Sequence, residues 1–211
     1  MSIKSEAIRK SLHLTGLLIP ISYLYLGKEL TLLFISVSVV LFFMIEPYRI
    51  SKDTTNKIIL GIKPLFTEET FKIISRGFEM VDKKIREITR KEEEKCIGAH
   101  LYFAIAALIN ILIFPMNIAI STVSVATVSD ALAAIVGKSI GHHKFKNGKS
   151  FEGSFAFFIS ALLIFILFVP LSYAIIGAIV GTIIEFYNVP PNDNFSNQLG
   201  MAFFLCLIAY L

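Results

Sequence analysis

The sequence predicts an all-α membrane protein: a bundle of about seven transmembrane helices with a cytoplasmic amphipathic helix. Three observations lead to this prediction. The chain of 211 residues is 55% hydrophobic, and its mean hydropathy of +0.72 is far above that of soluble globular proteins. Apolar runs of membrane-spanning length recur along the chain. Basic residues gather in alternate connections between these runs, as the positive-inside rule requires. The composition therefore excludes a soluble enzyme.

Seven apolar runs are candidates for membrane-crossing helices, which need about 17 to 25 residues. They cover residues 12–27, 30–45, 98–114, 116–137, 151–169, 170–187 and 198–211. The first run is not a cleaved signal peptide, because no small-residue cleavage site follows it and the second run begins almost at once. With the N-terminus in the cytoplasm, all of the 20 Lys and Arg residues except Lys28 lie on the cytoplasmic side. The C-terminus of this multi-pass cell-membrane protein is then expected outside.

Residues 1–211 are expected to form a single integral membrane domain, with a polar cytoplasmic insert at residues 46–97 between the second and third spans. From Phe71 to Ile88 the apolar residues of this insert alternate spacings of three and four, which predicts an amphipathic helix of about three heptads. Two roles stay open for it. In the first, the helix covers the cytoplasmic face of the bundle or lies in the headgroup layer. In the second, residues 66–95 form a homodimer seam. The net charge of +4 suits anionic lipid headgroups, and nucleic acid is not an expected partner.

Three carboxylates are expected near the cytoplasmic membrane face. Asp130 lies in the fourth apolar run, and a charge there costs roughly 2.5 to 3.5 kcal/mol on insertion scales, so it tends to persist where it binds an ion or lines a polar path. Glu185 ends a row of small residues formed by Gly177 and Gly181 in the sixth run, and Asp193 lies in the loop that follows. Carboxylate oxygens suit a hard cation. Asp130, Glu185 and Asp193 therefore predict a Mg²⁺ site.

The connection between the fourth and fifth runs is rich in cations and glycines. Gly141 and Gly148 permit close approach of the backbone, and Ser150 is a good N-cap whose helix would turn free N–H groups toward an anion. The nitrogen-bearing side chains of this connection are Lys138, His142, His143, Lys144, Lys146 and Lys149. The combination favours a polyphosphate, and plain positive-inside anchoring is the alternative. It is not a P-loop, because His143 stands where that motif needs its first glycine.

These segments, in this order, resemble the CTP-dependent lipid kinase family that includes dolichol kinase, phytol kinase and the CTP-dependent diacylglycerol kinase. The resemblance covers nearly the whole chain, and its specific part runs from Asp130 to the KSFEG block at 149–153. The matching residues are Glu6, Arg9, Lys10, His13, Glu93, Gly98, Ala99, Ser129, Asp130, Ala131, Ala134, Gly137, the segment 149–154, Glu185, Asp193 and Asn194.

The resemblance implies transfer of the γ-phosphoryl group of CTP to the hydroxyl of a membrane lipid alcohol, with Mg²⁺ as cofactor. The alcohol would be a polyprenol or dolichol, a phytol-like isoprenoid, or a diacylglycerol-like lipid. The catalytic residues would be Asp130, Lys149, Glu152 and Glu185. The nucleotide-binding residues would be Arg9, Lys10, His13, Lys138, Gly141, His142, Lys144, Lys146, Ser150 and Gly153.

Two other functions stay open. A CTP-dependent phosphatidate cytidylyltransferase, or an archaetidate-like equivalent, would make a CDP-lipid, but the lysine-aspartate and Pro-Gly-His-Gly-Gly signature of that family is absent from this sequence. A small membrane transporter would use Asp130 as a coupling residue near the midplane. Its charges should then be distributed toward both membrane faces, whereas nearly all candidate polar groups here are expected at one face.

Overall fold

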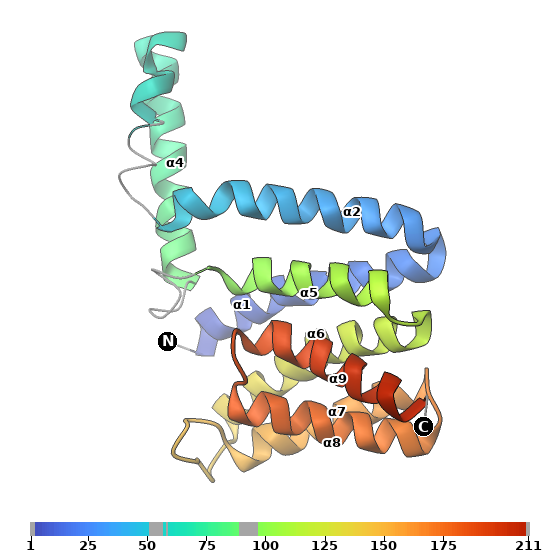
Figure 1. The fold of residues 1–211 in the computed structure, drawn as a ribbon. Helices are drawn as coiled ribbons and strands as arrows, with labels where there is room; N and C mark the ends of the chain where they lie inside the picture. Colours follow the sequence, from blue (N-terminus) through green and yellow to red (C-terminus); the bar gives the residue numbers. More distant parts are fainter. Residues whose placement is uncertain (1–2, 51–56, 58, 89–96, 210–211) are drawn as a thin grey trace.

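The chain folds into a bundle of helices. The computed structural model describes residues 3–50, 57, 59–88 and 97–209, and within these ranges the only β-structure is an isolated bridge between Lys144 and Ser150. Figure 1 shows the bundle helices lying side by side with one helix, α4, standing away from them. The helices are α1 (Ile3–Leu14), η1 (Thr15–Leu17), α2 (Leu18–Ile50), η2 (Lys63–Leu65), α4 (Glu68–Ile88), α5 (Ala99–Ile113), α6 (Met116–Ser139), α7 (Phe151–Ile166), α8 (Leu171–Tyr187) and α9 (Asp193–Ala209). The predicted all-α class is confirmed.

The first two apolar runs form a helical hairpin that turns at Gly27. Gly27 has a φ of 80°, a left-handed conformation that glycine adopts without the clash of a side chain. The part of α2 after Gly27 runs back along the bundle (Figure 1). Gly16 in η1 permits another close approach, because a Cβ there would lie 2.7 Å from the ring of Phe103 in α5.

Helix α6 is the central helix of the bundle. It contacts α1, α2, α5, α7 and α9, and it buries Ser121, Thr122, Thr127, Ser129 and Asp130. Three of these hydroxyls donate to carbonyls one turn earlier in the same helix, for example from Thr127 to Val123 at 2.7 Å. Such bonds satisfy a buried hydroxyl within its own helix. The hydroxyls of Ser121, Thr122 and Thr127 can therefore be buried without partners on neighbouring helices.

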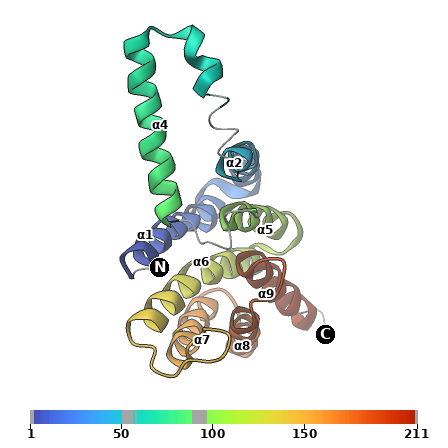
Figure 2. The same ribbon diagram turned by 90° about the vertical axis from the view of Figure 1, so that its left-hand side faces the viewer.

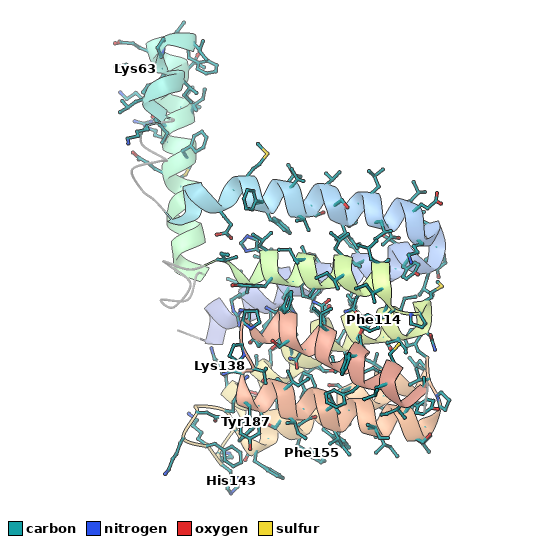
Figure 3. All side chains as sticks on the ribbon, in the orientation of Figure 1. Lys63, Phe114, Lys138, His143, Phe155 and Tyr187 are labelled. Carbon is teal, nitrogen blue, oxygen red and sulfur yellow. The ribbon has the colours of Figure 1, made fainter. Side chains whose placement is uncertain are left out.

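The outer faces of the bundle are apolar. Figure 3 shows side chains projecting from the outer helices all along the bundle. Exposed large apolar residues include Leu33, Val37, Phe43, Leu163, Leu167, Leu171 and Ile183. Apolar surface of this extent is unusual for a soluble monomer, and it indicates a membrane protein.

Each of the seven apolar runs predicted as a span falls mainly within a helix. Two helical segments, Ile8–Glu46 with its turn at Gly27 and Met116–Ser139, are long and apolar enough to cross a membrane by length and composition. Three further apolar helices, α5, α7 and α8, are shorter, at 15 to 17 residues. The number of seven transmembrane helices therefore stays a prediction.

The polar connections gather at one end of the bundle. In Figure 1 the N-terminal helix, the start of α5, the connection between α6 and α7, and the turn between α8 and α9 lie at that end. The turn at Gly27, the α5–α6 turn and the α7–α8 turn lie at the opposite end, with the C-terminus. This arrangement agrees with the predicted alternation of polar and short connections. We call the two ends the loop end and the turn end.

Both borders of the predicted insert meet at the loop end. The carboxylate of Glu46 in α2 accepts a hydrogen bond from the Gly98 N–H at 3.0 Å and lies 3.1 Å from the His100 ring. A Cβ on Gly98 would lie 2.7 Å from the same carboxylate oxygen. Glu46 thus joins the end of α2 to the start of α5. Of the insert between them, the predicted amphipathic helix is present as α4.

The predicted loop before the last span is shorter than expected. The sequence interpretation placed Asp193 and Asn194 in a loop at 188–197, whereas α9 begins at Asp193. Asn192 caps this helix, because its side-chain oxygen accepts from the Asn194 N–H at 3.0 Å. Asn197 and Gln198 are buried inside the bundle. The polar composition of this stretch suggested a loop, whereas these polar residues are part of a helix that packs into the core.

Candidate functional site

A pocket of about 490 Å³ lies at the loop end, where α6, α7, α8 and α9 meet the connection between α6 and α7. Its residues come from five segments that are distant in sequence. They are Asp130, Ala133, Ala134, Gly137, Lys138, Lys144, Asn147, Gly148, Lys149, Ser150, Gly153, Ser154, Glu185, Asn188 and Asp193. The pocket brings together the acidic and basic groups that the sequence interpretation had assigned to one site.

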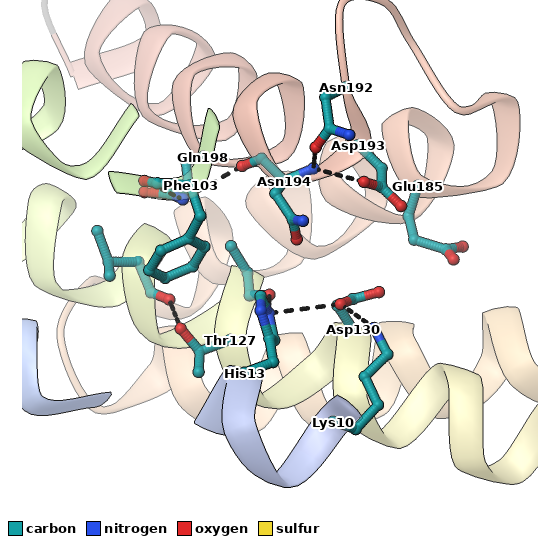
Figure 4. A network of polar contacts seen from close by, with 12 residues as sticks. Lys10, His13, Phe103, Thr127, Asp130, Glu185, Asn192, Asp193, Asn194 and Gln198 are labelled. Atoms are coloured by element: carbon teal, nitrogen blue, oxygen red, sulfur yellow. Dashed lines mark hydrogen bonds and ion pairs between the residues drawn. The ribbon is translucent and has the colours of Figure 1, made fainter. Parts of the chain in front are cut away.

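Asp130 is held by two residues of α1. The Lys10 ammonium donates to an Asp130 carboxylate oxygen, and the His13 Nε2 atom lies 3.4 Å from the same oxygen and 3.1 Å from the Ala126 carbonyl. Figure 4 shows both side chains rising from α1 to Asp130. The side chains of Lys10 and Asp130 are only 3% and 9% exposed, so each charge is paired where water is scarce.

Glu185 makes the second ion pair of the site, in which the carboxylate is buried and the Lys149 side chain is 23% exposed. The Lys149 ammonium donates to Glu185 Oε1, while Oε2 is buried without a hydrogen-bond partner. The Glu185 side chain is 5% exposed, and it lines the pocket together with Asp130 and Asp193. An unpartnered buried carboxylate oxygen is costly. Oε2 is therefore available to a ligand that brings a donor or a cation.

A short hairpin presents Lys149 to Glu185. The Phe145 N–H donates to the Lys149 carbonyl at 2.8 Å, and the Gly148 N–H closes a turn on the Phe145 carbonyl at 3.0 Å. Gly148 has a φ of 81°, which favours glycine. Asn147 holds the hairpin by donating to the Phe186 carbonyl in α8 at 2.8 Å and accepting from the Lys149 N–H at 3.1 Å. The hairpin is thus fixed against the end of α8.

Three glycines bring α6 and α7 into backbone contact beneath the pocket. A Cβ on Gly153 would lie 2.9 Å from the Ala133 carbonyl oxygen and 3.2 Å from the Gly137 Cα atom. A Cβ on Gly141 would lie 2.2 Å from the Gly137 carbonyl oxygen. Such contacts are possible only because these residues lack side chains. Gly141 and Gly153 therefore position the connection between α6 and α7.

The start of α7 is capped by the protein itself. Ser150 accepts from the Gly153 N–H at 3.1 Å, as the N-cap prediction requires, and the Phe151 N–H donates to the His143 carbonyl at 2.9 Å. Glu152 accepts from the His143 N–H at 3.2 Å, and its carboxylate lies 2.7 Å from the His143 ring. This helix start therefore offers fewer free N–H groups to an anion than its sequence suggested.

Most of the residues predicted for the site meet there. Asp130, Lys138, Lys144, Lys149, Ser150, Gly153, Glu185 and Asp193 line the pocket, and Lys10 and His13 contact Asp130 from outside it. Arg9, Gly141, His142, Lys146 and Glu152 are not among the lining residues. The sequence interpretation had not assigned Asn147, Ser154 or Asn188. The Asn147–Gly148 dipeptide, a strong turn signal, could have identified the first of these.

The carboxylates that line the pocket do not form a metal-binding cluster by themselves. Within the described ranges, no group of three or more His, Cys, Asp or Glu side chains is arranged to hold a metal. Asp130 and Glu185 are paired with lysines instead. Mg²⁺ usually binds through one or two carboxylates together with substrate phosphates and water. The unpartnered Glu185 Oε2 atom fits that role, with Asp130 and Asp193 nearby.

Comparison with known proteins places the chain in a family. An uncharacterized protein of Methanocaldococcus jannaschii is 33% identical over 184 residues, which cover 86% of this chain and 81% of the relative. The chain belongs to the family of this archaeal protein. An uncharacterized protein of Rickettsia prowazekii is 29% identical over 215 residues, which cover 98% of this chain and 96% of the relative.

More distant relatives carry a functional name. A probable chloroplastic phytol kinase of Triticum aestivum is 26% identical over 190 residues, which cover 81% of this chain and 63% of the relative. A probable phytol kinase 1 of Oryza sativa subsp. japonica is also 26% identical, over 76% of this chain and 57% of the relative. The chain thus spans less than two thirds of either plant protein. No family model matches the chain, and no solved structure matches it.

Proposed function

We propose that this protein is a membrane lipid kinase that transfers the γ-phosphoryl group of CTP to the hydroxyl of a membrane lipid alcohol. The observation that carries the proposal is the pocket at the loop end, where two buried carboxylates are each paired with a lysine on a different segment. Distant homology to plant proteins named as phytol kinases supports a lipid kinase. CTP as donor follows from the sequence resemblance to CTP-dependent lipid kinases.

In this proposal seven helices cross the membrane and the loop end faces the cytoplasm. Apolar outer faces, together with buried polar side chains inside the bundle, favour this placement. The exposed lysines of the connection between α6 and α7, Lys138, Lys144 and Lys146, all lie at the loop end, in agreement with the positive-inside rule. The pocket then opens at the cytoplasmic membrane face, where CTP is available and a lipid hydroxyl can approach from the headgroup layer.

The chemistry needs positioning and charge neutralisation more than covalent help from the protein. The lipid oxygen forms a bond to the γ-phosphorus, the bond from that phosphorus to the β-phosphate oxygen breaks, and CDP leaves. A pocket carboxylate accepts the proton of the lipid hydroxyl. Lys149, Lys138 and Lys144 line the pocket and would offset the negative charge of the phosphates.

Magnesium fits the same residues. The unpartnered Glu185 Oε2 atom would bind it together with the phosphates, with Asp130 and Asp193 also in the pocket lining, and it would supply neutralisation of the charge on the transferring group. Lys10 and His13 would orient Asp130, since both contact one of its carboxylate oxygens. A transport function is less favoured, because these groups gather at the loop end instead of along a path between both ends.

The test is phosphoryl transfer by the purified full chain in lipid nanodiscs. The chain receives γ-labelled CTP or γ-labelled ATP with Mg²⁺ and a panel of polyprenol, phytol-like and diacylglycerol lipids. Label is expected in an extractable lipid with CTP, and Asp130→Asn should lower the rate by at least about 100-fold. The matched control is Glu29→Gln, which removes an exposed carboxylate next to the Gly27 turn and should leave the rate unchanged.

Two outcomes would reject the kinase. In a parallel reaction with cytidine-labelled CTP and phosphatidic acid, incorporation of cytidine into lipid, without γ-labelling of any alcohol, would identify a cytidylyltransferase. Equal loss of activity in Asp130→Asn and Glu29→Gln would show that the pocket carboxylate has no specific role in the reaction.

A further inference from the structure

Helix α4 lies beside the bundle at its loop end. Figures 1 and 2 both show it running across the direction of the bundle helices and extending out past α2, while it also contacts α1. If the bundle helices cross the membrane, a helix in this position lies along the membrane surface. Because it extends beyond the bundle, much of its length would face lipid headgroups and not the pocket.

The apolar surface of α4 is wide, and residues on both of its flanks are exposed. At 100° per residue the apolar side chains Phe71, Ile73, Ile74, Phe78 and Met80 cover about half of the helix circumference. Ile73 and Met80, on one flank of this apolar arc, are 71% and 64% exposed, and Phe78 on the other flank is 43% exposed. The preceding segment adds the exposed residues Leu60, Leu65 and Phe66. Phe71 and Ile74 are half-buried, so the rest of the described protein covers part of this arc and leaves residues on both of its flanks exposed.

The opposite face of α4 is charged. Lys72, Arg76 and Glu79 are exposed there, and Lys57 and Lys63 are exposed in the segment before the helix. Residues 57–88 contain seven Lys and Arg against five Asp and Glu, a net charge of +2. A basic polar face opposite a broad apolar face is typical of helices that lie in a membrane interface, and anionic headgroups attract such charges.

We propose that α4 is a membrane-surface helix. Its apolar arc lies at the boundary between headgroups and acyl chains of the cytoplasmic leaflet, and its Lys and Arg side chains contact anionic lipid headgroups. The inference rests on the membrane placement in the proposed function. A second copy of the chain is a poorer fit, because a two-helix seam is a narrow apolar stripe, whereas both flanks of the α4 arc are apolar and exposed.

The chain contains no tryptophan, so a single introduced tryptophan reports its own surroundings. We would place Phe78→Trp in the full chain, reconstituted in vesicles of phosphatidylcholine and phosphatidylglycerol with bromine at defined acyl depths. Its emission should be blue-shifted, and it should be quenched most by shallow bromines. The matched variant Arg76→Trp lies on the polar face and should be quenched at least about twofold less. Leu163→Trp, on the exposed side of α7, should be quenched by deep bromines.

The three tryptophan variants test the position of α4 separately from the membrane placement of the bundle. Quenching of Leu163→Trp with equal, weak quenching of Phe78→Trp and Arg76→Trp would leave the bundle in the membrane and overturn the surface helix. A Phe78→Trp emission that shifts with the protein-to-lipid ratio, and that bromine does not quench, would assign α4 to a dimer seam instead. An unquenched Leu163→Trp would overturn the membrane placement, and with it this inference.

Discussion

At the scale of single residues, the site is built from one buried and one partly buried ion pair, which also connect elements of the fold. Lys10 joins α1 to Asp130 in α6, and Lys149 joins the hairpin to Glu185 in α8. Removing one partner of a buried pair leaves an uncompensated charge and costs about 3 to 5 kcal/mol. Loss of activity in a single substitution therefore mixes chemistry with stability, and paired substitutions are needed to separate them.

Lys10→Met should destabilise the protein because it leaves the Asp130 carboxylate without its closest cation. The double variant Lys10→Met with Asp130→Asn removes both charges and should recover much of the lost thermal stability while remaining inactive. Thermal unfolding in detergent and phosphoryl transfer in nanodiscs measure the two properties. A double variant as unstable as Lys10→Met alone would show that Lys10 stabilises the protein by packing and not by pairing with Asp130.

Asn147→Ala should weaken nucleotide binding with a smaller effect on the maximal rate. It removes the hydrogen bonds to the Phe186 carbonyl and the Lys149 N–H, so Lys149 would be less well positioned before substrate binds. We expect KM for CTP to rise by about tenfold, the equivalent of one or two hydrogen bonds. The neighbouring variant Lys146→Ala, whose side chain is not in the pocket lining, should leave KM near its original value. A larger rise for Lys146→Ala would return that lysine to the nucleotide site.

At the scale of helices, the length of the apolar runs and the positions of the glycines in the sequence predicted most of the fold. Seven apolar runs predicted the bundle helices well, because a run of this length is a strong signal. The start of α9 was misplaced because Asn194 and Asn197, which precede the predicted span, are polar and yet buried, which composition alone does not reveal. Asp130 was correctly placed in the fourth apolar run, which forms α6, but the sequence did not show that the buried hydroxyls of Ser121 and Thr127 bond within that helix.

Gly153→Ala should separate α6 from α7. The added Cβ would lie 2.9 Å from the Ala133 carbonyl oxygen and 3.2 Å from the Gly137 Cα atom, and backbone atoms cannot rotate away. We expect the free energy of unfolding to fall by about 1 to 3 kcal/mol. Activity should fall further than this loss of stability explains, because the hairpin that carries Lys149 directly precedes the contact between α6 and α7 at Gly153. Gly77→Ala in α4 is the control, since nothing lies within 4 Å of its Cβ. Alanine favours a helix over glycine, so this control should not destabilise the protein.

At the scale of the whole molecule, the polar connections gather at the loop end and the short turns lie at the turn end (Figure 1). The distribution of Lys and Arg in the sequence predicted this sorting, but it could not predict which cations meet. Lys138, Lys144 and Lys149 reach the pocket, whereas Lys146 and His142 in the same connection do not line it. That difference depends on a hairpin held by Asn147. The hairpin contacts α8, which is distant in the sequence, so no local sequence pattern predicts this contact.

The sidedness of the two ends can be tested by labelling single cysteines. Cys96 and Cys206 are first replaced by serine, and Lys28→Cys or Lys146→Cys is then introduced. An impermeant maleimide should label Lys28→Cys from outside intact cells, and Lys146→Cys only in inverted membrane vesicles, because Lys28 lies next to the Gly27 turn and Lys146 lies at the loop end. Labelling of both from the same side would mean that the chain does not cross the membrane as proposed. Exposure of Lys146 alone on the outer surface would place the pocket away from cytoplasmic CTP, and the kinase proposal would then lose its phosphoryl donor.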